Sequence, residues 1–193
     1  MKTKQLFLLL VIGLISVFYI GCGSNKQLSQ TNEGNIPDWF LNVPQDPNYI
    51  FQPSTATSQD MQLAIDKATQ DARAEVARTV QVKMEGLQKK FDEEVGVKDN
   101  STLLQQFTQA TKSVVSESLN GSQVKQKQIS KDGQVWRAYV LVQYPIGAAS
   151  DAFLKQIKNN NEMYTRFRAS QTFKELNDEV QKYEDWKAKQ QMH

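Results

Sequence analysis

The chain has 193 residues, with 23 Lys or Arg and 21 Asp or Glu, and its formal net charge is +2. This near-neutral balance gives no case for a nucleic-acid-binding surface, because such a surface needs clustered Lys and Arg. The only histidine is the C-terminal His193 and the only cysteine is Cys22, which leaves no credible His/Cys metal set, Ser–His dyad or Cys–His dyad. An enzyme would have to use carboxylates, Lys, Arg or Tyr alone, so we expect no catalytic residue, no metal and no cofactor.

The N-terminal segment has the three-part layout of a secretory leader. Lys2 and Lys4 precede an apolar run that ends at Ile20 and is followed by Gly21 and Cys22. A positive region, an apolar region and a small residue are typical of a signal peptide. The run is shorter than the roughly 20 residues that a membrane-spanning helix needs. We therefore predict that residues 1–21 are a signal peptide, cut between Gly21 and Cys22, and that the remaining chain is neutral.

The sequence around the cysteine, Tyr19-Ile20-Gly21-Cys22, resembles the bacterial lipobox, whose usual form is Leu-Ala/Ser-Gly/Ala-Cys. Tyr19 departs from the usual Leu. The resemblance implies that Cys22 carries a diacylglycerol and an amide-linked acyl chain such as palmitate. It also implies that Gly23, in place of a retaining Asp, sends the protein to the outer membrane. Each buried methylene contributes about 0.8 kcal/mol, so two or three chains would hold the protein there. The alternatives are an uncleaved anchor and a plain secretory leader with a chance cysteine.

The segment after the cysteine is expected to be a tether that leads into a domain. Residues 22–35 are polar and lack hydrophobic periodicity, which is typical of a flexible linker. Trp39 and Phe40 follow Pro37, and two adjacent aromatic residues on a free tether would reduce solubility. We predict that they pack as a lid on the domain. The alternative is an exposed hook for a partner protein.

A short strand and a long helix are predicted next. Tyr49-Ile50-Phe51 indicates a strand that ends at Pro53. A helix from about Gln59 to Val95 is indicated by apolar residues at spacings of three and four, with Thr57 and Asp60 as its capping box and Gly86 as a break or bend. Its apolar stripe comprises Met61, Ala64, Ile65, Ala68, Ala72, Val76, Val80, Met84, Leu87, Phe91 and Val95. The charged residues lie mostly off this stripe and are interpreted as a solvated face, with pairs such as Glu75–Arg78.

The following segments predict a second helix and a β-hairpin. Asn100 or Ser101 should cap the helix, which carries an apolar set of its own. A strand from Ser122 to Ile129, a turn at Asp132-Gly133 and a strand from Gln134 to Tyr144 complete the hairpin. One face of the last strand is apolar, and the other is mixed and expected to be partly wet. The apolar face holds Trp136, Ala138, Val140, Val142 and Tyr144, and the mixed face holds Val135, Arg137, Tyr139, Leu141 and Gln143.

The C-terminal part is predicted to be helical from Gly147 onward, with an interruption at residues 159–161. Its last apolar set, Phe173 to Tyr183, is too short for a coiled coil and suits a helix that leans on the domain or on a partner. The expected fold class is therefore α+β. A small antiparallel sheet, formed by a short N-terminal strand and a C-terminal hairpin, packs on a long helix. We expect a domain at 36–146 and a helical C-terminal extension at 147–193.

The order of these elements resembles the LPP20 family of bacterial outer-membrane lipoproteins, which includes flagellum-associated members. The resemblance covers about Ile36 to Pro145. It rests on Pro37-Asp38-Trp39-Phe40, on the Ala-rich stretch from Ala68 to Glu75, and on the hairpin that contains Asp132-Gly133. The family often has Gly-x-Gly after the first strand, where this chain has Gln52 to Ala56. The resemblance implies a small α+β domain without established catalytic residues.

Two functions are compatible with these features. The first is a non-enzymatic structural or interaction module that is anchored to outer-membrane lipid through Cys22. It would bind a protein partner or a second copy of itself, and a more specific form of this hypothesis is a role in flagellar assembly or motility. The second is a small-ligand carrier with Trp136, Tyr139 and Tyr144 as stacking residues, which core packing would also explain. The expected partner or ligand contacts are Trp39, Phe40, Trp136 and Tyr139.

Overall fold

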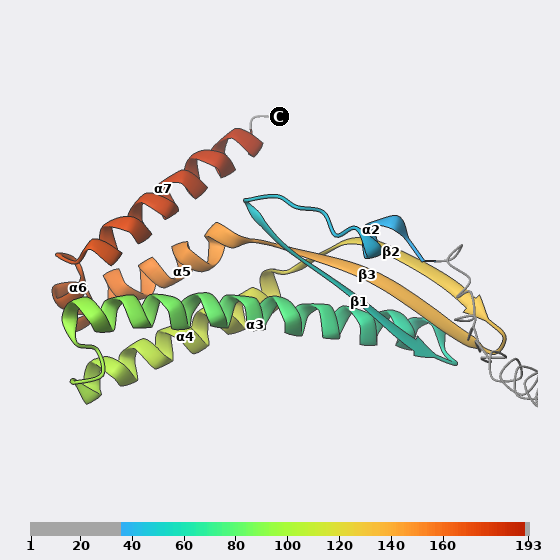
Figure 1. The fold of residues 1–193 in the computed structure, drawn as a ribbon, viewed down its shortest axis with the longest axis horizontal. Helices are drawn as coiled ribbons and strands as arrows, with labels where there is room; N and C mark the ends of the chain where they lie inside the picture. The colour runs from blue at the N-terminus through green and yellow to red at the C-terminus, as the bar shows by residue number, and fades with distance from the viewer. Residues whose placement is uncertain (1–35, 192–193) are drawn as a thin grey trace, which may run out of the picture. The chain divides into compact units, whose positions relative to one another are not determined.

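The computed structural model describes residues 36–191, which form an α+β fold (Figure 1). This confirms the predicted fold class. The predicted signal peptide, Cys22 and the predicted tether lie outside the described residues. The elements are α2 (Asp38–Leu41), β1 (Tyr49–Ser58), α3 (Met61–Val95), α4 (Ser101–Gly121), β2 (Gln123–Asp132), β3 (Val135–Pro145), α5 (Ile146–Asn159), α6 (Asn161–Phe167) and α7 (Gln171–Gln191).

The sheet is antiparallel, with β3 in its centre and β1 and β2 at its edges. The hairpin between β2 and β3 turns at Gly133, whose φ of 60° suits glycine. The prediction that the first strand ends at Pro53 is wrong, because β1 continues to Ser58 and Pro53 lies opposite Leu141. An edge strand has one side without a neighbour, so proline is tolerated where its nitrogen faces that side.

The long helix α3 starts one residue after its cap. The carboxylate of Asp60 accepts a hydrogen bond of 2.7 Å from the backbone N–H of Leu63. Thr57 lies within β1, opposite Arg137, so its predicted part in the cap is wrong. The predicted break at Gly86 is also wrong, since α3 is continuous to Val95. Packing on both sides of Gly86, at Met84 and Phe91, outweighs the weak helix propensity of one glycine.

The core has two parts, which follow the two halves of α3. In the first half, small buried residues lie against the inner face of the sheet, which we define as the face toward α3. Small side chains let the helix approach the strands closely. In the second half, α3 packs against α4. The residues of the first contact are Ala64, Ala68, Ala72, Val76 and Val80 of α3, and Ala138, Val140 and Val142 of β3.

Four phenylalanines from four helices fill the second part of the core. The rings of Phe91 and Phe167 stack with centroids 4.2 Å apart, and the rings of Phe107 and Phe153 meet edge to face at 4.9 Å. All four side chains are fully buried. Such aromatic pairs contribute about 0.5–1.5 kcal/mol beyond the burial of their area. Because Phe153 and Phe167 lie on α5 and α6, the C-terminal helices contribute to the core of the same domain.

Helix α7 is held at its start and in its middle. The carboxylate of Glu94, at the end of α3, accepts hydrogen bonds from the backbone N–H groups of Gln171 (2.6 Å) and Thr172 (3.0 Å). Glu94 of α3 therefore caps the N-terminus of α7. Farther along, Glu179 pairs with Lys83 of α3 and accepts a hydrogen bond of 2.9 Å from the hydroxyl of Ser150 on α5. These contacts join α3, α5 and α7.

Candidate functional site

The outer face of the sheet, which we define as the face away from α3, carries most of the predicted contact residues. Strand residues alternate between faces, and Gln52, whose side chain donates to Thr79 of α3 at 3.0 Å, marks the inner face. Tyr139 and Leu141 are on the outer face, yet their exposed fractions are only 6% and 0%. The expectation that this face is partly wet is therefore wrong at these two residues.

Helix α2 covers one part of the outer face (Figure 1). The ring of Phe40 meets the ring of Tyr139 edge to face, with centroids 5.0 Å apart, and Trp39 lies beside Phe40 at 6.2 Å. Trp39 and Phe40 are both half-buried. The structure thus places Phe40 on the sheet, as the lid interpretation predicts, and brings Trp39, Phe40 and Tyr139 together.

Trp136, the fourth predicted contact residue, is separate from this group. Its even position along β3 places it on the inner face of the sheet, and the ammonium group of Lys131 on β2 lies 5.0 Å from the centroid of its ring. Tyr144 has the same parity but is buried in the core, where burial raises its pKa to about 12. Because residues at odd and even positions of a strand face opposite ways, Trp136, Tyr139 and Tyr144 do not form one stacking site.

A second aromatic group lies on the outer face and was missed by the sequence reasoning. We call Tyr49, Phe51, Tyr183 and Trp186 the aromatic cluster. Tyr49 and Phe51 stack at 5.7 Å, Tyr183 and Trp186 stack at 5.8 Å, and Tyr49 meets Trp186 edge to face at 5.4 Å. The only sequence signals were spacings of two on a strand and three on a helix. Neither indicates that β1 and α7 meet.

A β-bulge in β2 directs a lysine onto this cluster. The register of β2 against β3 shifts between Val124 and Gln126, which leaves Lys125 as the extra residue. Its ammonium group is 4.6 Å from the ring centroid of Phe51 and 6.0 Å from that of Tyr49. Bulges often redirect a side chain in this way, and a cation over an aromatic face is favourable.

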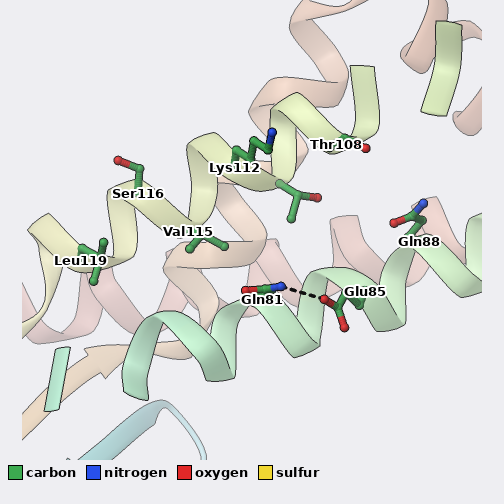
Figure 2. Close-up of a pocket in the computed structure, with 9 residues that line it drawn as sticks. Gln81, Glu85, Gln88, Thr108, Lys112, Val115, Ser116 and Leu119 are labelled. Atoms are coloured by element: carbon green, nitrogen blue, oxygen red, sulfur yellow. Dashed lines mark hydrogen bonds between the residues drawn. The ribbon is translucent and has the colours of Figure 1, made fainter. Parts of the chain in front are cut away.

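A groove of about 460 Å³ lies between α3 and α4. Figure 2 shows Val115 of α4 pointing toward Gln81 of α3, and Gln81 donates a hydrogen bond of 2.9 Å to Glu85. Leu119 lies at one end of the groove and is 37% exposed. The hydroxyl of Thr111, which also lines the groove, is buried and has no hydrogen-bond partner among residues 36–191. The groove therefore offers the apolar side chains of Val115 and Leu119, while the hydroxyl of Thr111 is buried beneath its surface.

The predicted lipidation and cleavage residues, Cys22 and Gly21, lie outside the described residues. Within residues 36–191, no group of three or more His, Cys, Asp or Glu could hold a metal ion. No helix of that part of the chain combines the length and apolar character needed to span a membrane. Neither the family models nor the curated proteins compared with this chain give a match.

Proposed function

We propose that the protein is a lipid-anchored, non-enzymatic interaction module of the bacterial outer membrane. The observation that carries this proposal is the position of Cys22, the only cysteine of the chain, directly after an apolar run and Gly21. Acyl chains on Cys22 would fix the domain at the membrane surface, where its effective concentration toward a partner in the same layer is raised. The resemblance to the LPP20 family supports this proposal and its narrower version, a role in flagellar assembly or motility.

The anchoring is tested by replacing the cysteine. Cys22→Ser is expected to abolish incorporation of labelled palmitate and to move the protein from the outer-membrane fraction to a soluble fraction. Tyr19→Leu, which restores the usual first lipobox residue, is the matched control and should stay anchored. If Cys22→Ser remains in the outer membrane, or if the mature wild-type protein has an unmodified thiol by intact-mass measurement, lipid anchoring through Cys22 is wrong.

The groove between α3 and α4 supports the interaction part of the proposal. The lining residues on α4 recur at helical spacing over three turns, from Thr108 to Leu119. The rim of the groove carries the opposite charges of Glu85 and Lys112. An amphipathic helix of a partner protein fits such a groove, with apolar side chains on Val115 and Leu119 and its own charges at the rim. A partner helix is therefore the occupant that we propose for the groove.

The groove is tested by crosslinking in intact cells from a photoreactive residue at Ser116. A crosslink to one partner protein is expected with the wild-type domain and should be lost in Leu119→Asp. The matched control is Leu63→Asp, because Leu63 is on α3, outside the groove, and is 46% exposed. A crosslink that survives Leu119→Asp, or that Leu63→Asp also removes, counts against the groove as the binding surface.

A small-ligand carrier is the second candidate function. The stacking residues that the sequence suggested for it, Trp136, Tyr139 and Tyr144, are on different faces of β3, and Tyr144 is in the core. The aromatic cluster is the observation that favours ligand binding instead, since four rings meet beside a cavity.

A further inference from the structure

The aromatic cluster borders a cavity of about 300 Å³ at one end of the sheet, which we call the aromatic pocket. Its lining residues lie where β1 begins, β3 ends and α7 runs through its last turns. Figure 1 shows the start of β1 and the last turns of α7 at the same end of the sheet. Tyr49, Tyr183 and Trp186 contribute rings to this lining. The pocket shares no lining residue with the groove between α3 and α4.

The rings of the aromatic cluster are only partly covered by the rest of the domain. All four side chains are half-buried, and none of them belongs to the core. Tyr49 and Phe51 are nearly parallel to each other, with an angle of 28° between their planes, whereas Tyr49 and Trp186 are nearly perpendicular, at 81°. The cluster therefore presents ring surface in two orientations to whatever occupies the pocket.

The polar groups of the pocket are mainly carboxamides. Gln123, Gln143, Gln190 and Gln191 line it, and within residues 36–191 their side-chain amides make no hydrogen bond. Each amide offers an N–H₂ donor and a C=O acceptor side by side. Vicinal hydroxyl groups of a sugar match this pair, and the C–H face of the sugar ring packs on an aromatic ring. Few polar groups placed among aromatic surfaces are typical of small-molecule sites.

The pocket has one lysine in its lining and a second lysine beside it. Lys187 lines it, with its ammonium group 5.9 Å from the ring centroid of Tyr183, and Lys125 lies over Phe51 and Tyr49. No Asp or Glu is among its lining residues, and the nearby Asp151, which pairs with Lys155, and Glu184 lie outside the lining. In a chain whose charges are otherwise nearly balanced, this local excess favours a ligand with a negative group.

A close approach between Gly147 of α5 and Tyr183 of α7 fixes where α7 lines the pocket. A Cβ on Gly147 of α5 would lie 2.5 Å from the Cβ of Tyr183, which is closer than any real contact. The absence of a side chain at Gly147 thus lets α7 approach, and this places Tyr183 and Trp186 at the sheet.

We propose that the aromatic pocket binds an acidic oligosaccharide, with sugar rings stacked on Tyr49 and Trp186 and a carboxylate near Lys125 and Lys187. The free amides of the four glutamines bind hydroxyl groups. This inference does not depend on acylation of Cys22 or on the groove.

The test uses full-length protein in detergent, with trigalacturonate as the acidic probe and maltotriose as the neutral one, followed by calorimetry. Trigalacturonate is expected to bind, and its affinity should fall as salt rises, because an exposed ion pair is screened. No binding of trigalacturonate overturns the proposal, and so does equal binding of both sugars.

Two lysine variants locate the site. Lys125→Gln removes the charge over Phe51 and should weaken trigalacturonate binding by about twofold to fivefold, as for loss of one exposed ion pair. Lys131→Gln is the matched control, since Lys131 also lies over an aromatic ring, that of Trp136, but on the other face of the sheet. If both variants weaken trigalacturonate binding equally, the assignment of the binding site to the aromatic pocket is wrong.

A third variant tests the stacking. Trp186→Ala should reduce the affinity by about fivefold or more, since stacking of a flat group on one aromatic ring contributes on the order of 1–3 kcal/mol where it has been measured. Circular dichroism and thermal unfolding verify that α7 is still folded. If Trp186→Ala unfolds α7, the comparison of Lys125→Gln with Lys131→Gln tests the site by itself, because both lysines are on β2 and not on α7. Full retention of affinity in a folded Trp186→Ala protein overturns the stacking role.

Discussion

Gly147 and Tyr183 approach so closely that a methyl group on Gly147 would overlap the Cβ and Cγ atoms of Tyr183, each at 2.5 Å. Because both are parts of helices, neither can move without shifting α5 or α7. We expect Gly147→Ala to destabilise the domain by about 1–3 kcal/mol, the usual cost of overpacking. Denaturant unfolding measures this change. A stability equal to the wild-type value would contradict the close approach.

Gly86 is expected to give the opposite result. It lies within α3, and a Cβ built on it meets nothing within 4 Å. Alanine has the higher helix propensity and restricts the unfolded chain more, so Gly86→Ala should raise the free energy of unfolding by about 0.5–1 kcal/mol. The same denaturant titration measures it. A lower stability than the wild type would mean that α3 needs the glycine, for example for a bend.

The hydrogen bonds to Glu94 predict a pH dependence of stability. Hydrogen bonds from the hydroxyl and backbone of Thr172 lower the pKa of Glu94 from its ordinary value of 4.5. A lowered pKa in the folded state stabilises the fold above the unfolded value, and this contribution is lost as the pH falls from there through the folded value. Glu94→Gln should therefore lose stability at neutral pH and show a flatter pH profile below pH 4.5.

Urea unfolding at pH 7 and at several lower pH values measures this effect. The control is Glu93→Gln, because Glu93 is exposed and makes no hydrogen bond or ion pair within the part of the chain that the structure describes. Asp92, whose pKa is also lowered through its bond to the backbone of Lys98, leaves a remaining slope of the same sign in both variants. Identical profiles of the two variants would contradict the role of Glu94.

Phe107 is the centre of the aromatic part of the core, since its ring contacts those of Phe91, Phe153 and Phe167. Phe107→Ala should cost about 3–5 kcal/mol, which includes the cavity that the ring leaves behind. Val82→Ala is the control, because Val82 is 67% exposed and should change stability by no more than about 0.5 kcal/mol. Similar losses in both variants would contradict the core assignment.

The features that were predicted correctly depend on neighbours in sequence. Asp60 and Asn100 cap α3 and α4 through backbone N–H groups three residues away, and Gly133 supplies the positive φ of the hairpin. The Glu75–Arg78 pair likewise forms within one turn. Such interactions are encoded in four or five consecutive residues, so the sequence pattern suffices to identify them.

The errors arise where distant segments decide the outcome. Pro53 is compatible with β1 only because β1 is an edge strand, and an edge is a property of the whole sheet. Leu141 is buried on a face with mixed sequence. The aromatic cluster joins Tyr49 to Trp186, and neither residue has a local pattern that indicates the other. The suggested stacking group of Trp136, Tyr139 and Tyr144 does not form for a simpler reason, since an odd spacing along a strand places two residues on opposite faces.

The sharing of one core by α3 and the C-terminal helices has a consequence for biosynthesis. The buried half of α3 near Phe91 leaves the ribosome long before Phe167 and Leu176, which complete its surroundings. Until translation is nearly complete, α4 covers this apolar surface only in part, so a nascent or truncated chain would be a substrate for chaperones and proteases. A stop codon after Pro145 should therefore yield a polypeptide that is degraded or insoluble, although it still contains every strand of the sheet.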